Sequence, residues 1–400
     1  MTIVARIVLP AFLLLSVAAC GSQASAQKPS GPIQITHGGT YSGNWTSTDA
    51  KVAAVTIHTT EPVTIENSTI SGRGDLIQFA GGDLTVENVT GRALDPGVKG
   101  LQRGSFLATP QFRSLVVRNC SMIGVSFGVK AQGPAQTIEI ANNLASDLED
   151  RASDGHGGLL PERPRLGHFV ILNHVVAANG AEIAWNQVTQ TMGKTSTEDV
   201  ISIYESQGTQ THPIHVHHNF IQGSSTAVPG KNYTGDALIT DGDASATAAP
   251  TAYVLFEDNL IIETAGAGIG IDYGHDITAR SNRVVSCGVD SSGNRYAWGA
   301  TAVVLWNFYK SPHFFNNTIT GTTGGMVGPA ENHTFKPSNE YFVKAGAEDP
   351  SNKIAGDDFT NPCLTGGTSN PKAEDAERAR WATEVQAAHE TIGDRHLARP

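Results

Sequence analysis

Short runs of alternating apolar and polar residues recur along most of the chain, and each run ends at an asparagine. The first two are Val63-Thr64-Ile65-Glu66-Asn67 and Leu84-Thr85-Val86-Glu87-Asn88. Alternation with a period of two is typical of a β-strand with one buried face. The phrase recurs at Asn119, Asn142, Asn186, Asn219, Asn259, Asn282 and Asn317. The pattern therefore predicts repeated strand units.

The spacing of these asparagines indicates a solenoid. Asn67 and Asn88 are 21 residues apart, and Asn259 and Asn282 are 23 apart. Repeats of 20–50 residues with β-type periodicity are typical of parallel β-helices. Asparagine tolerates the left-handed backbone of a sharp bend, and amides stacked about 4.8 Å apart can bond to one another. We therefore expect one asparagine per coil to make the bend and join a ladder.

A third strand can be assigned to most coils, and the longer spacings are then inserted loops. An ordinary β-sandwich is the alternative, which the regular recurrence disfavours. The predicted fold is an all-β, right-handed parallel β-helix of about nine coils over residues 41–322. Its expected third strands are 76–79, 105–108, 125–129, 168–172, 200–204, 237–240, 268–272 and 302–306.

The two ends of the chain follow other patterns. The apolar run from Ile7 to Ala19 is typical of a signal peptide, so residues 1–26 predict export. Cys20 lies in a lipobox-like context, which favours a lipoprotein of the periplasm, outer membrane or cell surface, and Ala24-Ser25-Ala26 would instead give a secreted form. We interpret residues 27–40 as a flexible tether. In the extension 323–400, Asn370, Pro371 and Gly393 delimit a predicted helix over 371–392 that caps the solenoid.

Composition narrows the class of protein. Charged residues make up 16% and the net charge is −11, which argues against disorder and against nucleic-acid binding. Cysteine is sparse, with Cys120, Cys287 and Cys363 besides Cys20, and no CxxC spacing. We therefore expect neither a disulfide framework nor a zinc site, and Cys120 and Cys287 are predicted to be buried thiols.

Several phrases resemble those of secreted bacterial right-handed parallel β-helix proteins of the pectin-lyase-like superfamily. They are Ser71-Gly72-Arg73-Gly74-Asp75, Ser153-Asp154-Gly155-His156-Gly157, Glu198-Asp199-Val200-Ile201-Ser202 and Gly274-His275-Asp276. The resemblance covers roughly residues 40–320. It implies the fold firmly and the chemistry weakly, because the architecture serves polysaccharide lyases, glycoside hydrolases and uronate epimerases.

The candidate chemistry lies on loops that emerge from one edge of the predicted solenoid and on the adjoining strand. The loops are 91–103, 146–167, 190–198, 222–235 and 287–299. Polar groups are concentrated there in a chain of low charge, which favours a functional edge. The candidate catalytic residues are Tyr204, His156, Arg151, Lys130, His168 and Asp272. The candidate substrate-binding residues are Arg103, Glu198, Asp199, Trp306 and His275.

Three functions remain open, and all take a glycan as partner. The favoured one is a lyase that cleaves a uronic-acid polysaccharide, with Tyr204, His156, His168 or Lys130 as base and Arg151 or Arg103 neutralising the uronate. The second is a hydrolase that uses paired carboxylates, for which Glu198, Asp199, Asp241, Asp243 and Asp272 are candidates and Trp306, Tyr204 and Trp298 could stack on sugars. The third is a non-catalytic glycan-binding or envelope protein.

No cofactor is implied with certainty. Calcium is the one candidate, because Asp236, Asp241 and Asp243 are close in sequence near a predicted bend. A bound calcium ion would also offset the negative net charge, which otherwise counts against a polyanionic substrate.

Overall fold

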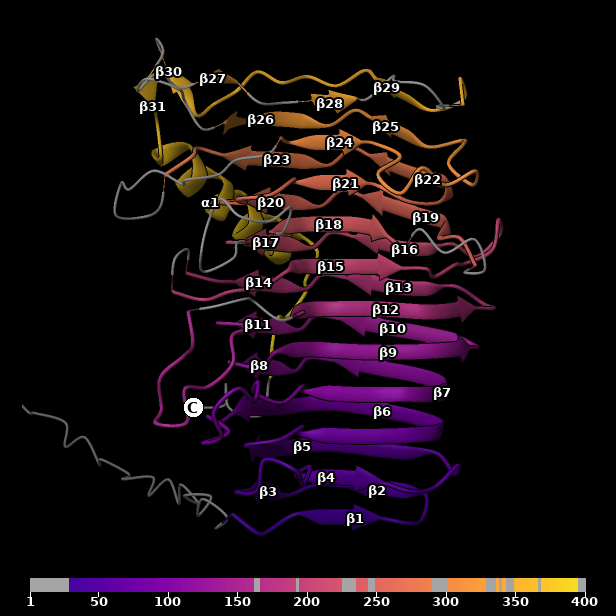
Figure 1. Ribbon diagram of the computed structural model, residues 1–400, viewed down its shortest axis with the longest axis vertical. Coiled ribbons are helices and arrows are strands. Elements are labelled where there is room, and N and C mark those ends of the chain that lie inside the picture. Colours follow the sequence, from indigo (N-terminus) through magenta and orange to yellow (C-terminus); the bar gives the residue numbers. More distant parts are fainter. Residues whose placement is uncertain are drawn as a thin grey trace, which may run out of the picture.

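The chain winds into a right-handed parallel β-helix, seen as a stack of short strands in Figure 1. The computed structural model describes residues 29–161, 166–191, 194–224, 235–243, 249–289, 301–328, 336–337, 340–342, 349–365 and 368–394. The predicted signal peptide, Cys20 and Trp298 lie outside these ranges. The predicted fold class is confirmed, and the described strands form ten complete coils and part of an eleventh, more than the nine or so expected.

Three faces run along the stack. Face 1 holds β2 (Gly39–Tyr41), the start of β5 (Val63–Gly72), the middle of β6 (Ile77–Ala93), the end of β7 (Leu107–Arg118), β10 (Thr137–Ala141), β13 (Ala181–Ala184), β16 (Ile214–His217), β19 (Ala252–Glu257), β22 (His275–Arg280), β25 (Thr318–Thr320) and β29 (Lys353–Ala355). Face 2 holds β3 (Asn44–Ser47), the ends of β5 and β6, β8 (Ser121–Ile123), β11 (Leu144–Ser146), β14 (Gln187–Thr189), β17 (Phe220–Gln222), β20 (Leu260–Ile262), β23 (Arg283–Ser286) and β26 (Thr323–Gly328).

Face 3 contains the third strand of each coil, as predicted. It holds β1 (Ile33–Ile35), β4 (Val55–Ile57), the starts of β6 and β7, β9 (Phe127–Ala135), β12 (His168–Ala177), β15 (Asp199–Tyr204), β18 (Asp236–Asp241), β21 (Ile269–Ile271), β24 (Val303–Leu305) and β28 (Glu340–Phe342). Strands on a face pair in parallel and in register, so Ile201 lies between Val170 and Leu238. Inward columns such as Leu172, Ile203 and Ile271 are fully buried in one continuous core.

At the corner between faces 1 and 2, different residues form the left-handed bend and the amide ladder. The sequence pattern predicted a single asparagine for both. In the early coils the left-handed residue is asparagine, with φ of 46° at Asn67 and 51° at Asn119. In later coils that position holds Trp185, His218, Asp258 or Ser281 instead. The asparagine of those coils is the next residue, so the prediction that one asparagine performs both roles is wrong.

The amide ladder is formed by the residue after the bend. Its members are Asn143, Asn186, Asn219, Asn259 and Asn282, all buried. Each side-chain nitrogen donates to the side-chain oxygen of the next, at 2.9 Å from Asn143 to Asn186 and from Asn219 to Asn259. Asn317 belongs to a different corner, between faces 3 and 1, where it pairs with Asn352.

The solenoid extends beyond both of its predicted limits. At the N-terminal end, β1 and β2 form part of the first coil, so the residues from 33 onward are not a tether. At the other end, β26, β28 and β29 continue the stack past residue 322. Two small antiparallel pairings follow, of β26 with β27 (Lys336–Pro337) and of β30 (Leu364–Thr365) with β31 (Thr368–Ser369).

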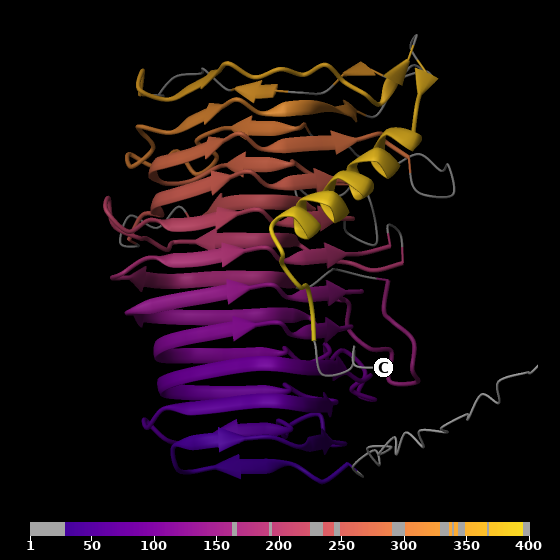
Figure 2. The same cartoon turned by 180° about the vertical axis from the view of Figure 1, so that it is seen from behind.

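The predicted C-terminal helix is present as α1 (Lys372–Ala387), which begins after Pro371 and ends five residues before the predicted limit. It packs obliquely against face 2, beside β20 and β23, rather than across the open end of the stack (Figure 2). Trp381 is buried there and its ring stacks on those of Trp185 and Phe220. Glu377 forms a bidentate ion pair with Arg283.

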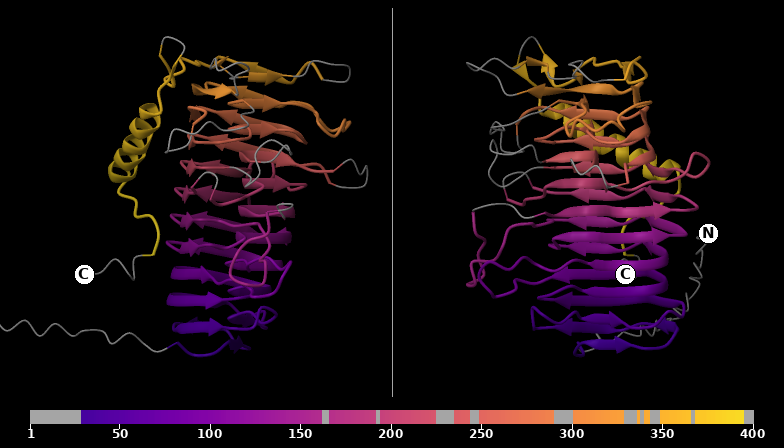
Figure 3. Two further views of the ribbon diagram at one scale, coloured as in Figure 1. Left: turned by 60° about the vertical axis from the view of Figure 1, so that its left-hand side comes forward. Right: turned by 45° about the vertical axis from the view of Figure 1, so that its right-hand side comes forward.

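The residues after α1 continue down the corner between faces 1 and 2, as the left view of Figure 3 shows. Asn142 donates to Glu390 at 2.6 Å and Asn119 to the carbonyl of Thr391 at 2.8 Å. Thr90 donates to Asp394 at 2.6 Å. We call α1 and residues 388–394 together the C-terminal strap, which contacts coils from β6 to β23.

One disulfide corrects the expectation from cysteine spacing. Cys287 at the end of β23 is bonded to Cys363, 76 residues further on, with an S–S distance of 2.01 Å. Cys120 is a buried free thiol, as predicted. No helix in the described ranges is both long and apolar enough to cross a membrane.

Candidate functional site

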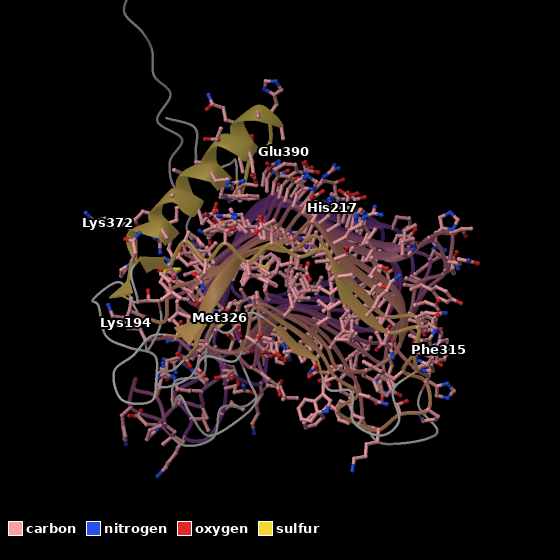
Figure 4. The ribbon with its side chains drawn as sticks, turned by 90° about the horizontal axis from the view of Figure 1, so that it is seen from above. Lys194, His217, Phe315, Met326, Lys372 and Glu390 are labelled. Carbon is pink, nitrogen blue, oxygen red and sulfur yellow. A yellow bond between two sulfur atoms is a disulfide. The ribbon has the colours of Figure 1, made fainter. Side chains whose placement is uncertain are left out.

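Loops project on both sides of face 3. In the view down the axis, Lys194 marks the corner between faces 2 and 3, and Phe315 the corner between faces 3 and 1 (Figure 4). The loops predicted at one edge, such as 146–167 and 190–198, leave from the first of these corners. Further loops, at 205–213 and 306–317, leave from the second. The outward side chains of face 3 are therefore flanked on two sides.

The middle of face 3 carries a line of carboxyl groups that we call the acidic strip. Its members are Glu198, Asp199, Asp236, Asp241 and Asp272. Asp199 lies beside Asp236 in the ladder, and the amide N–H of Asp236 donates to Asp199 Oδ1 at 3.1 Å. One column of face 3 contains Tyr204, Asp241, Asp272 and Trp306, each from the next coil along the stack.

Gly270 lies in the middle of the strip, between the carboxyl groups of Asp236 and Asp272. A Cβ added there would lie 3.4 Å from Asp236 Oδ2 and 3.6 Å from Asp272 Oδ1. The two oxygens therefore converge on one point and cannot be more than about 7 Å apart. Asp272 Oδ1 is buried and accepts no hydrogen bond. A side chain at residue 270 would fill the space that the two carboxyl groups face.

Burial and like charge keep protons on the strip. Burial, with the charges of Asp236 and Asp241, raises the pKa of Asp272 well above its usual range. Burial raises the pKa of Asp236 to about 7, although the amide of Ala267 donates to its Oδ1 and lowers the pKa. Burial and the charge of Asp236 also raise the pKa of Asp199. Closely packed carboxyl groups cannot all ionise together, so protons are shared along the strip.

Aromatic groups border the end of the strip formed by the later coils, which we call its far end. Tyr309 donates its hydroxyl to Asp241 Oδ1 at 2.6 Å. Trp306 follows β24 beside Asp272, and its ring meets that of Phe308 at 4.8 Å. Tyr204 stacks on His174, and burial raises its pKa to about 12, so this phenol holds its proton at neutral pH.

At the near end of the strip, which the earlier coils form, His168 approaches it from β12. Its Nε2 lies 3.2 Å from Glu198 Oε2, and one ligand atom from each of His168, Glu198 and Asp199 lies within 4.8 Å of the others. Asp150 is buried nearby, and burial raises its pKa to about 7. The second cluster of this kind among the described residues, Cys287, Cys363 and Glu374, includes the disulfide and offers no thiolate.

Several predicted site residues lie elsewhere or are held by other groups. Arg151 makes a bidentate ion pair with Glu149, and His156 is exposed on its loop. Lys130 is on face 3, with its Nζ 4.9 Å from the ring centroid of Phe127. Arg103 donates to the carbonyl of Gly124.

His275 begins β22 on face 1, where it bonds to Asp276 at 2.7 Å, so it does not meet Asp272. The grouping behind the calcium expectation is also wrong. Asp236 and Asp241 are the first and last residues of β18, and therefore Asp236, Asp241 and Asp243 do not meet at one bend.

Sequence reasoning missed Gly270 and Tyr309 as parts of the site, and it considered Asp236 only for calcium. Alternation already places Ile269 and Ile271 inward, which leaves Gly270 outward. A glycine in the middle of a strand often marks a close approach to another group. Tyr309 gives no such signal, because it reaches Asp241 from a loop 68 residues away.

No family model, curated protein or solved structure matches the chain. The assignment of a function therefore depends on the geometry of face 3.

Proposed function

We propose that this protein is an exported glycoside hydrolase that binds a polysaccharide along face 3 and cleaves it with Asp236 and Asp272. The observation that supports the proposal is the convergence of their carboxyl oxygens on the position of Gly270, where no side chain separates them. Glycosidases use two carboxyl groups, about 5–5.5 Å apart when configuration is retained and about 6.5–9.5 Å apart when it is inverted. The upper limit of about 7 Å is compatible with either outcome.

The surroundings of the two groups favour different roles. Asp272 has a buried oxygen without a hydrogen bond, and its raised pKa suits a general acid that is protonated before reaction. Asp236 accepts the amide of Ala267, which opposes the rise in its pKa caused by burial and suits this group better than Asp272 as a base or nucleophile. Trp306 and the exposed Phe308 give sugar rings a surface beside Asp272.

A uronate lyase is the second candidate. It is favoured by the carboxylates at the near end of the strip, which can hold a cation that neutralises a uronate. Against it, the high pKa of Tyr204 opposes proton abstraction by this phenol, and Arg151 is already paired with Glu149. These observations make hydrolysis the preferred proposal.

Export and a glycan partner belong to the same proposal. The Cys287–Cys363 disulfide supports an oxidising compartment, because such bonds persist mainly outside the cytosol. The choice between lipid anchoring through Cys20 and full secretion can be tested by mass spectrometry of the mature N-terminus. A pectin-lyase-like ancestry is supported by the fold alone.

The test is incubation of the purified protein with alginate, pectate, glucuronan, gellan and neutral polysaccharides. New reducing ends without the ultraviolet absorbance of unsaturated uronates would support hydrolysis, and ends with that absorbance would favour the lyase.

Asp236→Asn and Asp272→Asn should each lower turnover by about 100-fold or more. Asp83→Asn, which removes only an ion pair to Arg113, is the matched control and should retain activity. Binding without turnover of any polymer would contradict both enzymes.

A further inference from the structure

The cluster of His168, Glu198 and Asp199 is a group of possible metal ligands made of other residues than the carboxyl pair at Gly270. His168 and Asp199 are 2% and 4% exposed, and Glu198 lies at the rim with 27% of its side chain exposed. Their ligand atoms lie within 4.8 Å of one another. Donor atoms that each lie about 2.0–2.2 Å from one metal ion are at most about 4.4 Å apart, so these three groups would need only a small approach to bind one ion.

The tautomer of His168 is fixed by the backbone. Its Nδ1 is 3.1 Å from the carbonyl oxygen of Asp199, and a carbonyl can only accept, so Nδ1 carries a proton. In the neutral ring Nε2 then presents its lone pair to Glu198 and Asp199. A histidine that donates one ring N–H to a carbonyl and offers the other nitrogen is the usual arrangement of a metal ligand.

The Nε2 atom also lacks a hydrogen-bond partner. It is buried, and although Glu198 Oε2 is 3.2 Å away, the direction does not suit an N–H···O bond. A buried ring nitrogen without a partner is costly, and two carboxylates beside a lone pair repel it. A cation held between the three groups would remove both costs.

We propose that His168, Glu198 and Asp199 bind one first-row divalent cation such as Zn²⁺ or Mn²⁺. An imidazole nitrogen with two carboxylates suits these ions, whereas Ca²⁺ prefers a shell of oxygen atoms only. Three protein ligands leave coordination positions for water or a substrate oxygen. Because Asp199 Oδ1 also accepts the amide of Asp236, the ion would lie next to the carboxyl pair.

The test measures bound metal rather than activity. Tag-free protein is stripped with a chelator, equilibrated in turn with Zn²⁺, Mn²⁺ and Ca²⁺, desalted and analysed by mass spectrometry for metal. We expect about one equivalent of Zn²⁺ or Mn²⁺ per chain, and an affinity about tenfold or more lower in His168→Ala and in Glu198→Gln. Asp272→Asn should bind metal like the wild type. The result of this test therefore does not depend on whether the hydrolase proposal is correct.

A second histidine cluster provides the matched control. His215, His217 and His218 are adjacent on face 1 and its corner, with the ring centroids of His215 and His217 4.0 Å apart. His217→Ala should leave the bound metal unchanged. The proposal is overturned if the wild type retains only Ca²⁺ or no ion, if His217→Ala alone loses the metal, or if both site variants retain it. Should His168→Ala misfold by circular dichroism, Glu198→Gln at the rim decides alone.

Discussion

Asn119 and Asn219 occupy adjacent positions of the same kind of corner and contribute to stability in different ways. Asn119 has the left-handed backbone, with φ of 51°, and its side chain makes one bond to Thr391. Asn219 is in the ladder, where it donates to Asn259 and to the carbonyl of Ile183 and accepts from Asn186.

Glycine substitution should separate the two contributions. Asn119→Gly should lower the free energy of unfolding by no more than about 1 kcal/mol, because glycine adopts the left-handed region without strain. Asn219→Gly should lower it by about 2–4 kcal/mol, because several buried groups lose their partners. Urea unfolding of the two variants measures the difference, and equal losses would contradict the separation of roles.

Gly270→Ala tests directly the position between Asp236 and Asp272. The added methyl group would lie in ordinary contact with Asp236, Ile239 and Asp272, and the backbone of Gly270 is not left-handed. We expect the melting temperature to be nearly unchanged and turnover to fall by at least about tenfold, because the methyl group occupies the space between the two carboxyl groups. Gly31→Ala, with nothing within 4 Å of its added methyl group, is the control. Full activity in Gly270→Ala would exclude this site.

The sequence predicted that asparagines form the corner between faces 1 and 2. It did not predict which of two adjacent residues makes the bend and which joins the ladder. Asparagine is favoured both at a left-handed bend and in an amide ladder, and the two positions are adjacent, so Asn142 and Asn143 could not be told apart. Among the site residues, Asp272 is predicted by alternation, which leaves its side chain outward, whereas Asp199 is a candidate only because charged residues are concentrated at the loop edge. His275 lies beyond the bend that follows Asp272, so its side chain belongs to another face.

At the scale of elements, α1 is attached to face 2 by a buried pair of carboxyl groups. Glu374 lies against Glu263, accepts the amide of Cys287 at 2.7 Å, and is 2% exposed. Burial and the charge of Glu263 raise the pKa of Glu374 to about 8, while Arg378 opposes the shift. The folded protein therefore holds a proton that the unfolded chain releases above about pH 4.3.

Stability should accordingly fall as the pH rises from about 5 to about 8, because the folded state binds the extra proton over this window. Glu374→Gln retains an acceptor for the amide of Cys287 and should flatten the decline. Melting temperatures between pH 5 and pH 9 for both proteins give the comparison. A slope that is the same in Glu374→Gln would assign the dependence to other groups.

The disulfide should stabilise the same attachment. It closes a loop of 76 residues, which is worth up to about 4 kcal/mol in the chain-entropy account. Replacing Cys287 and Cys363 together with serine should lower the melting temperature, whereas Cys120→Ser serves as the control for loss of a thiol outside the bond. Equal melting temperatures of the oxidised wild type and the double variant would contradict this contribution. The pairing was not predictable from spacing, because it depends on how the extension folds back.

For the whole molecule, the coil repeat made the architecture predictable, since each strand pairs only with its neighbours along the stack. The path of the C-terminal extension was not predictable. The polar partners of the strap are far apart in sequence and share no common pattern; they are Arg283, Asn142 and Thr90. Its apolar contacts are concentrated on Trp381.

Removal of residues 371–400 should change how the protein unfolds. Stacked repeats interact mainly with their neighbours and can open from an end. The strap links coils as distant as β6 and β23, so its loss should make unfolding less cooperative. Hydrogen exchange of the shortened chain should show faster exchange over faces 1 and 2 from β6 to β23. Uniform protection equal to that of the full chain would contradict a coupling role.

The path of the strap also sets an order for biogenesis. Coils can stack one upon another while the polypeptide is still emerging, each using the one before as its template. Asp394, however, bonds to Thr90 in the third coil, so this bond can form only after synthesis has reached residue 394. A chain that stops short of residue 394 would thus assemble a stack without this bond between the strap and the third coil.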